Sequence, residues 1–226
     1  KWLRWALQLV AKLKHLKASY QHGLSGEGRA SLGMTADNNN SAHTATYPYN
    51  PYPFPWASHL SHDAPSLAIG VFEGHMIKMA EGFKAIRTAE LEIKAKYDKT
   101  EHDQFFAYFD WRQFSEEEYL LCPPLVSLTT DGSSFDSGFQ NLSNSLLSGT
   151  PIKVLVLDNQ RLDDANKSAK QLGLIAMAHQ TAYVHQGSIA NTAHLLEGYI
   201  DGLNYRGPAL WKIYTSSQAE NGLANN

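Results

Sequence analysis

The chain has 226 residues, and its content of 43% hydrophobic, 18% charged and 11% aromatic residues is typical of a globular protein. Nineteen basic and 22 acidic residues leave a formal charge of −3, which argues against a nucleic-acid partner held by bulk electrostatics. The single cysteine, Cys122, excludes an internal disulfide and an iron–sulfur or zinc–thiolate site built by this chain alone, and no apolar run is long enough to predict a membrane span. We therefore expect one soluble, cytoplasmic domain over residues 1–226.

The first 20 residues have the periodicity of a helix. Large apolar side chains recur at steps of three and four residues, which predicts an amphipathic helix, and the accompanying charges are all positive. Such a helix either packs on its own domain or docks on a membrane surface or a partner, and we favour packing. The apolar positions are Trp2, Trp5, Leu9, Leu13, Leu16 and Tyr20, and the cations are Lys1, Arg4, Lys12, Lys14 and Lys17.

Two segments without helical periodicity follow. Residues 21–45 are rich in Gly, Ser, Asn and Ala and are predicted to be loop, so that 1–45 form an N-terminal helix and loop. Residues 46–56, TYPYNPYPFPW, alternate four prolines with aromatic residues. Proline removes backbone donors and fixes φ, so this segment is predicted to be an extended strap whose rings pack on a core or line a pocket. A polyproline ligand is the alternative.

A long helix and an insertion are predicted in the middle of the chain. Residues 66–72 fit either a short buried strand or the first turn of the helix that continues over 73–97. Residues 98–119 are polar and aromatic, which indicates an inserted helical hairpin or a surface excursion.

Strands and helices alternate from residue 123 onward. This alternation predicts an α/β fold, namely a doubly wound, mostly parallel sheet with helices on both faces. The segment 152–159, IKVLVLDN, is the clearest strand because nearly all of it is β-branched or leucine. The predicted strands are 123–130, 152–159, 181–186 and 208–215, and the predicted helices are 135–149, closed by Gly149, 171–179 and 190–203.

Two of the predicted strands end in groups that can bind a metal ion. Asp131 follows the first strand, and Asp158-Asn159 closes the second. The carboxyl ends of parallel strands share one edge of a sheet, so these oxygens and the backbone carbonyl of Arg161 could hold Mg²⁺ beside a diphosphate. The helix after Asp131 would point its first N–H groups at the same phosphates. A turn without a metal is the alternative.

The other candidate groups favour structural interpretations. His59, His62 and Asp63 have a metal-ligand spacing, but a chain with ten histidines produces such spacings by chance. The remaining candidates are Cys122, interpreted as a small buried hydrophobe, Asp163-Asp164, interpreted as a solvated turn, and His179, His185 and His194, which form no recognisable cluster.

Four long blocks of the sequence are similar to those of a known family. They are TYPYNPYPFPWASHLSHDAPSLAIGVFEGHM (46–76), FQNLSNSLLSGTPIKVLVLDNQ (139–160), LGLIAMAHQTAYVHQGSIANTAHLLEGYIDGL (172–203) and RGPALWKIYTSSQAENG (206–222). In the same order, they resemble the thiamine-diphosphate-binding domain of pyruvate:ferredoxin (flavodoxin) oxidoreductases. The spacing of 28 positions between Asp131 and Asn159 also resembles the frame of the thiamine diphosphate motif.

The resemblance implies a fragment of a larger enzyme that converts pyruvate to acetyl-CoA by oxidative decarboxylation and passes electrons to ferredoxin or flavodoxin. It implies thiamine diphosphate and Mg²⁺ as cofactors, a homodimer, and partner domains or subunits, one of which supplies the glutamate that activates thiamine. By this resemblance, Mg²⁺ would be bound by Asp131, Asn159 and the carbonyl of Arg161. The residues expected to bind or adjoin the cofactor are Asp131, Gly132, Ser133, Asp136, Asn159, Trp56 and Ser58, with Asp63 in the same block.

The chain departs from the family pattern where the cofactor and the cluster would bind. Thr129-Thr130 replace two glycines at which the backbone approaches the diphosphate, and residues 161–170 lack the glycines of the loop that wraps it. Residues 35–40 replace another family segment, and Ser217 replaces a cluster cysteine, so no iron–sulfur cluster is expected in this chain. The alternative function is a non-catalytic scaffold, decayed or engineered, that keeps the fold and has lost cofactor and cluster binding.

Overall fold

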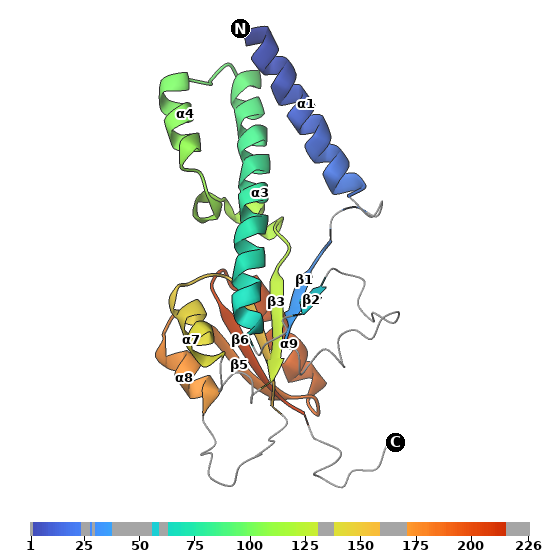
Figure 1. The fold of residues 1–226 in the computed structure, drawn as a ribbon, viewed down its shortest axis with the longest axis vertical. Coiled ribbons are helices and arrows are strands. Elements are labelled where there is room, and N and C mark those ends of the chain that lie inside the picture. The colour runs from blue at the N-terminus through green and yellow to red at the C-terminus, as the bar shows by residue number, and fades with distance from the viewer. Residues whose placement is uncertain are drawn as a thin grey trace. The chain divides into compact units, whose positions relative to one another are not determined.

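The computed structural model describes residues 2–23, 28, 30–37, 56–58, 63–130, 138–158 and 171–215. The chain divides into two compact units (Figure 1). Unit 1 comprises Lys1–Ser31 and Glu73–Pro123, and unit 2 comprises Leu32–Phe72 and Pro124–Asn226.

Secondary structure was predicted best where the hydrophobic pattern is strong. The first helix, the long middle helix and every strand and helix predicted after residue 123 are present, with boundaries that differ by a few residues. The helices are α1 Trp2–Gln21, α3 Ala64–Ile93, α4 Lys99–Ala107, η2 Trp111–Gln113, α5 Glu116–Leu120, α7 Phe139–Leu147, α8 Leu172–Ala178 and α9 Thr192–Asn204, and the strands are β1 Gly33–Ala36, β2 Trp56–Ser58, β3 Leu125–Thr130, β4 Lys153–Asp158, β5 Tyr183–Ser188 and β6 Ala209–Tyr214.

Unit 2 is built on a parallel sheet. Its six described strands have the order β2-β1-β3-β4-β6-β5, and every neighbouring pair is parallel. The central strand β4 has Val154 and Val156 fully inaccessible on one face and Leu155 half-buried on the other. Its neighbour β6 is buried on both faces at the adjacent residues Leu210 and Trp211, as expected inside a parallel sheet. The predicted α/β fold with a parallel sheet is therefore confirmed.

Helices cover both faces of this sheet (Figure 1). Side chains of adjacent residues in a strand point to opposite faces, and β5 shows where the helices lie. His185 contacts Gly198 of α9, whereas the next residue, Gln186, contacts Gly173 of α8. Thus α8 and α9 lie on opposite faces, in the doubly wound arrangement that the sequence predicts.

The face beneath α9 has a well-defined core around Trp211. This side chain is 2% exposed, packs edge-to-face on Tyr199, and donates a hydrogen bond from Nε1 to the carbonyl of Gly198 at 2.8 Å. A Cβ atom at Gly202 would lie only 2.6 Å from Trp211 Nε1, so glycine is required for this close approach. The other buried members of this cluster are Val126, Ala209 and Ile213.

The loop prediction for 21–45 is wrong at β1. Residues 33–36 form a strand paired with β2 on one side and β3 on the other, and Met34 to Ala36 are buried. The sequence Gly-Met-Thr-Ala has no strong strand propensity, so only the neighbouring strands fix it in extended form. The strap predicted for 46–56 lies outside the described residues except for Trp56, the first residue of β2.

The helix α3 resolves the alternatives left open for 66–72. These residues are helical, and Asp63 begins the helix by accepting a hydrogen bond from the Ser66 N–H. The helix ends at Ile93 rather than at 97. Ala95 has a φ of +51°, and Lys96 donates its N–H to the carbonyl of Leu91, which is the geometry of a helix C-terminus.

Unit 1 is helical and rich in aromatic contacts. Phe109 lies between Phe106 and Phe114, with ring centroids 6.0 and 5.6 Å away, and Phe83 of α3 packs edge-to-face on Phe114 at 4.9 Å. The segment predicted as a helical insertion, 98–119, forms α4, η2 and α5. None of the helices in the described ranges is both long and apolar enough to cross a membrane.

Hydrogen bonds at helix starts organise this insertion. Asp98 caps α4 by accepting from the Thr100 N–H at 2.7 Å. Asp110 begins η2, and Ser115 begins α5, each in a capping box in which the side chain three residues later bonds back. These short helices have little propensity of their own to fold, so the caps are a principal source of their stability.

Candidate functional site

The carboxyl edge of the sheet in unit 2 is the candidate functional site. In an open parallel sheet, ligands bind outside the carboxyl ends of the strands. The central strands β3 and β4 are neighbours, and their paired residues include Thr130 with Leu157, so they end at the same edge. Asp131 and Asn159 follow these two strands in the sequence. The adjacency on which the magnesium prediction depends is therefore present.

Most of the predicted site residues lie outside the described residues, and their roles stay predictions. Of the predicted set, β2 contains Trp56 and Ser58, which pair with Met34 and Ala36 of β1. The residues outside the described ranges are Asp131, Gly132, Ser133, Asp136, Asn159 and Arg161, together with His59, His62, Asp163, Asp164 and Ser217.

A buried carboxylate lies at this edge, directly after β1. Asp37 has no exposed surface, and its Oδ2 accepts a hydrogen bond from Thr129 Oγ1 of β3 at 2.7 Å. Its backbone N–H donates to the carbonyl of Leu128 at 3.3 Å. Asp37 lies in the segment 35–40, which replaces a family segment, and no role was predicted for it. An aspartate at the end of a strand is the signal that could have identified it, had β1 been recognised.

A second carboxylate at the edge is paired with a lysine. Asp158 ends β4, and its Oδ2 lies 2.7 Å from Nζ of Lys212 on β6, with both side chains at least 80% buried. The Asp158 carbonyl also accepts from the Thr215 N–H at 2.9 Å. Lys212 was missed in the sequence, although a lysine inside an otherwise apolar strand is itself a signal of a buried partner.

Asp63 joins two helices at the border of this edge. Its Oδ2 accepts from Asn141 Nδ2 of α7 at 2.6 Å, while its Oδ1 caps α3 through the Ser66 N–H. Both carboxylate oxygens thus have protein partners. This arrangement favours a positioning function for Asp63, which links the start of α3 to α7.

The described residues at this edge combine oxygen atoms that can ligate a metal with the ammonium group of Lys212. The carboxylates of Asp37 and Asp158 and the Thr129 hydroxyl are hard oxygen ligands of the kind that Mg²⁺ prefers, and Lys212 offsets one negative charge. Within the described ranges, no three His, Cys, Asp or Glu residues form a group that could hold a metal ion. The Mg²⁺ ligands predicted from the resemblance remain those outside these ranges.

The interpretation that the three histidines do not cluster is wrong for two of them. The rings of His185 and His194 lie 4.5 Å apart, because β5 and α9 pack together. Burial and the neighbouring His194 lower the pKa of His185, whose Nε2 has no hydrogen-bond partner among the described residues. His179 lies apart and bonds to Ser143 at 3.0 Å. Sequence spacing could not reveal this pair, because it depends on tertiary packing.

A perturbed lysine lies at the opposite end of the sheet. Lys153 begins β4, is 1% exposed, and donates from Nζ to the carbonyls of Tyr205 and Gly207 at 2.5 and 2.8 Å. Burial lowers its pKa to about 8. Because it lies at the amino end of its strand and donates to two carbonyls of the 205–207 turn, it stabilises this turn rather than the candidate site.

No protein-family model matches the chain, and no curated protein matches its sequence. Its structure is similar to that of 2-oxoglutarate:ferredoxin oxidoreductase from Magnetococcus marinus, determined with 2-oxoglutarate, coenzyme A and succinyl-CoA bound. The TM-score is 0.52 and the identity 10%, over 94% of this chain and 63% of that chain. The chain thus spans less than two thirds of this neighbour. The likeness shows the fold alone and agrees with the predicted α/β fold on a parallel sheet.

Two other solved structures are more distant. A protein from Mycobacterium smegmatis, described as a thiamin diphosphate-dependent enzyme, has a TM-score of 0.46 and 13% identity over 83% of this chain and 29% of that chain. Benzoylformate decarboxylase from Polynucleobacter necessarius has a TM-score of 0.45 and 13% identity over 91% of this chain and 32% of that chain.

Proposed function

We propose that the chain is the thiamine-diphosphate-binding domain of a 2-oxoacid:ferredoxin or flavodoxin oxidoreductase. The observation that carries the proposal is the likeness in fold, over 94% of the chain, to a 2-oxoglutarate:ferredoxin oxidoreductase. The sequence blocks described above, which resemble pyruvate:ferredoxin oxidoreductases, support it independently. Pyruvate is the 2-oxoacid proposed, with oxidative decarboxylation to acetyl-CoA as the reaction.

The cofactor is proposed to bind at the carboxyl edge of the sheet. Mg²⁺ would be held by the side chains of Asp131 and Asn159 and by the carbonyl of Arg161. Ser133 and Asp136, which precede α7 in the sequence, would adjoin the diphosphate. The neighbouring, parallel strands β3 and β4 support this assignment, because both strands end at the same edge of the sheet.

The described groups at this edge suit a metal ion, because they include hard oxygen ligands. Lys212 holds Asp158 in place and would offset negative charge there. Asp37 fixes the hydroxyl of Thr129 and thereby the end of β3, directly before Asp131. Thiamine diphosphate, when bound, supplies the nucleophilic carbon that attacks the ketone carbonyl of a 2-oxoacid.

The complete reaction needs partners. The chain spans 63% of the 2-oxoglutarate:ferredoxin oxidoreductase chain that it matches. We propose that other domains or subunits supply the glutamate that activates thiamine and the iron–sulfur clusters, that ferredoxin or flavodoxin receives the electrons, and that the enzyme is a homodimer.

Calorimetric titration of the purified chain with thiamine diphosphate tests the proposal. We expect binding in the presence of Mg²⁺ that is lost on addition of EDTA and in Asp131→Ala. The matched control is Glu197→Ala, which removes an exposed carboxylate of α9 and should bind as the original chain does. Circular dichroism confirms that each variant is folded. The absence of heat at millimolar cofactor from a folded chain contradicts the proposal and favours the scaffold alternative.

A further inference from the structure

The helix α1 has two apolar faces, and among the described residues one of them packs on α3. On this inner face, Leu16 contacts Gly82 of α3, and the Tyr20 hydroxyl lies 3.5 Å from Met79 Sδ. This packing is partial, since no residue of α1 is fully buried. The packing predicted for this helix therefore accounts for only part of its apolar surface.

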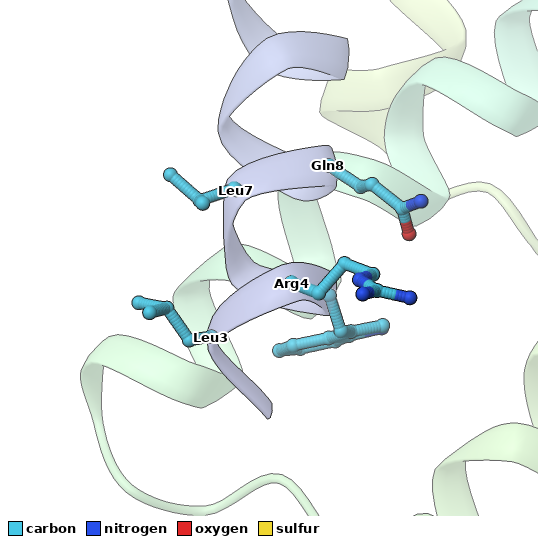
Figure 2. Close-up of a pocket in the computed structure, with 5 residues that line it drawn as sticks. Leu3, Arg4, Leu7 and Gln8 are labelled. Carbon is cyan, nitrogen blue, oxygen red and sulfur yellow. The ribbon is translucent and has the colours of Figure 1, made fainter. Parts of the chain in front are cut away.

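The outer face of α1 starts with an exposed apolar stripe. Leu3, Leu7 and Val10 are 66, 62 and 48% exposed and recur at steps of four and three residues. Leu3 and Leu7 point to the same side of the helix, whereas Arg4 and Gln8 point to the other (Figure 2). A hollow lined by these four residues and Trp5 runs along this end of α1. An apolar stripe of this kind marks an interaction surface.

The same stripe becomes basic further along. Lys14 and Lys17 continue it at the next steps of four and three residues, and both are exposed. No acidic residue occurs in residues 1–21, and no ion pair involves either lysine within the described ranges. The outer face of α1 is thus apolar over its first turns and cationic over its last.

A complementary stripe lies on α4 and on Tyr108, the residue that caps its C-terminus. Glu101, Phe105 and Tyr108 recur at steps of four and three residues, all are exposed, and the two rings are 43 and 83% exposed. The surrounding segment 98–118 contains seven acidic and two basic residues. This stripe begins with an acid and ends in large apolar side chains, which is the reverse of the order on α1.

The two stripes match when the helices run antiparallel. Val10 and Lys14 are four residues apart, and so are Phe105 and Glu101, which places each pair about 6 Å apart along its helix axis. With Val10 opposite Phe105, Lys14 faces Glu101 and Leu7 faces Tyr108. Apolar side chains then meet apolar side chains, and the charges are opposite.

We propose that α1 of one copy of this chain binds antiparallel to α4 of a second copy through these stripes. Among the described residues no ion pair links α1 to α4 within one chain, and in the view of Figure 1 the helix α3 lies between them. An anionic membrane would attract α1 but repel the acidic segment 98–118, and would leave Phe105 and Tyr108 exposed. A second copy covers both stripes. The contact does not depend on cofactor binding.

Sedimentation of the full chain at increasing concentration tests the proposal. Two helix faces form a small interface, so we expect weak association, with a mass above the 25.1 kDa monomer at about 100 µM chain and 0.05 M salt. Lys14→Glu and Glu101→Lys should each weaken association about tenfold, because each places like charges opposite one another. Leu7→Ser should also weaken it.

Rescue of association by compensating charge reversals distinguishes this contact from a general effect of net charge. An equimolar mixture of Lys14→Glu and Glu101→Lys chains restores opposite charges at every contact, as does the double variant, and both should associate as the original chain does. Lys94→Glu in unit 1 and Glu197→Lys in unit 2 change the net charge equally at other exposed positions and should have no effect. Circular dichroism checks that α1 remains helical.

Two results would overturn the proposal. One is a chain that stays monomeric at this concentration. The other is association that the single variants weaken but the mixture and double variant do not restore. Co-sedimentation with vesicles of phosphatidylcholine containing phosphatidylserine tests the alternative that α1 binds an anionic membrane. Binding that Lys14→Glu abolishes and Glu101→Lys leaves intact, from a monomeric chain, assigns α1 to a membrane surface instead.

Discussion

The two units of this molecule are stabilised in different ways. In unit 2, strands buried on both faces pack beneath helices, and Val154, Val156 and Leu210 have no exposed surface. In unit 1, short capped helices surround a cluster of phenylalanines. Arg87 of α3 also pairs with Glu118 of α5, and we call this pair the arginine clamp. The stabilisation from apolar burial scales with the buried area and is not screened by salt. Each exposed charge pair or cap stabilises the fold by less, and salt screens its contribution. We therefore expect larger mutational effects in unit 2 and more salt-dependent ones in unit 1.

Trp211→Ala should have the largest effect. It removes the centre of the cluster beneath α9 and the additional hydrogen bond from Trp211 Nε1 to the Gly198 carbonyl, so the free energy of unfolding should fall by about 3–5 kcal/mol. Urea denaturation followed by circular dichroism measures the loss, and hydrogen exchange should show it in β5 and β6. Trp211→Phe, which keeps most of the ring, is the control. A loss of less than about 1 kcal/mol would contradict burial as the main source of stability here.

Lys153 should give unit 2 a pH dependence in the alkaline range. Burial lowers its pKa to about 8 from 10.5, although the two carbonyl acceptors favour the charged form. Below pH 8, Lys153 is protonated in both the folded and the unfolded state, so it adds no pH dependence to the free energy of unfolding. Between pH 8 and 10.5 the unfolded chain holds more protons, so stability rises with pH, by on the order of 1–3 kcal/mol.

The measurement compares the original chain with Lys153→Met from pH 7 to 10.5. Subtracting the two curves removes the titration of the other lysines and of the tyrosines. The difference should favour the original chain increasingly as the pH rises. A difference that is independent of pH would mean that Lys153 keeps an ordinary pKa in the folded state.

Arg87→Ala tests the clamp of unit 1. Arg87 donates from Nε to Glu118 at 2.7 Å, and its guanidinium lies 4.7 Å from the Phe109 ring centroid. We expect a loss of about 1–2 kcal/mol that shrinks in 1 M salt, with Arg87→Lys intermediate. A loss that is the same at low and high salt would show that packing of the arginine stem, not its charge, stabilises unit 1.

The clamp should also be sensitive to acid. Burial raises the pKa of Glu118, but hydrogen bonds from Arg87 and Ser115 outweigh burial and hold the pKa below its usual value of 4.5. The stabilisation is therefore complete above pH 4.5 and is lost as the pH falls through the lowered pKa. The difference between the original chain and Arg87→Ala should decrease over that range.

Ser115→Ala should have the smallest effect. It removes the side-chain acceptor of the capping box of α5, so unit 1 should lose about 1 kcal/mol, while hydrogen exchange in β5 and β6 should not change. Ser115→Asp, which keeps an acceptor, should retain the stability. A change in exchange across unit 2 would show that the two units unfold together.

Much of the fold could be predicted because it depends on local pattern. The period of 3.6 residues in α1 and α3 and the apolar run 152–159 reflect burial on one or both faces, and each was assigned correctly. The strands β1 and β2 were not predicted, because residues such as Gly33 and Ala36 have weak strand propensity and are held extended by their neighbours.

The residues of the candidate site could likewise be predicted only in part. Sequence pattern alone predicts that the chain forms a parallel α/β sheet and that polar residues follow β3 and β4, because a strand pattern and the residue after it are local features. Which other groups gather at this edge depends on tertiary contacts. Asp37 meets Thr129, and Lys212 meets Asp158, only because strands distant in the sequence are neighbours in the sheet. Such pairs depend on strand order and register, which no local pattern specifies.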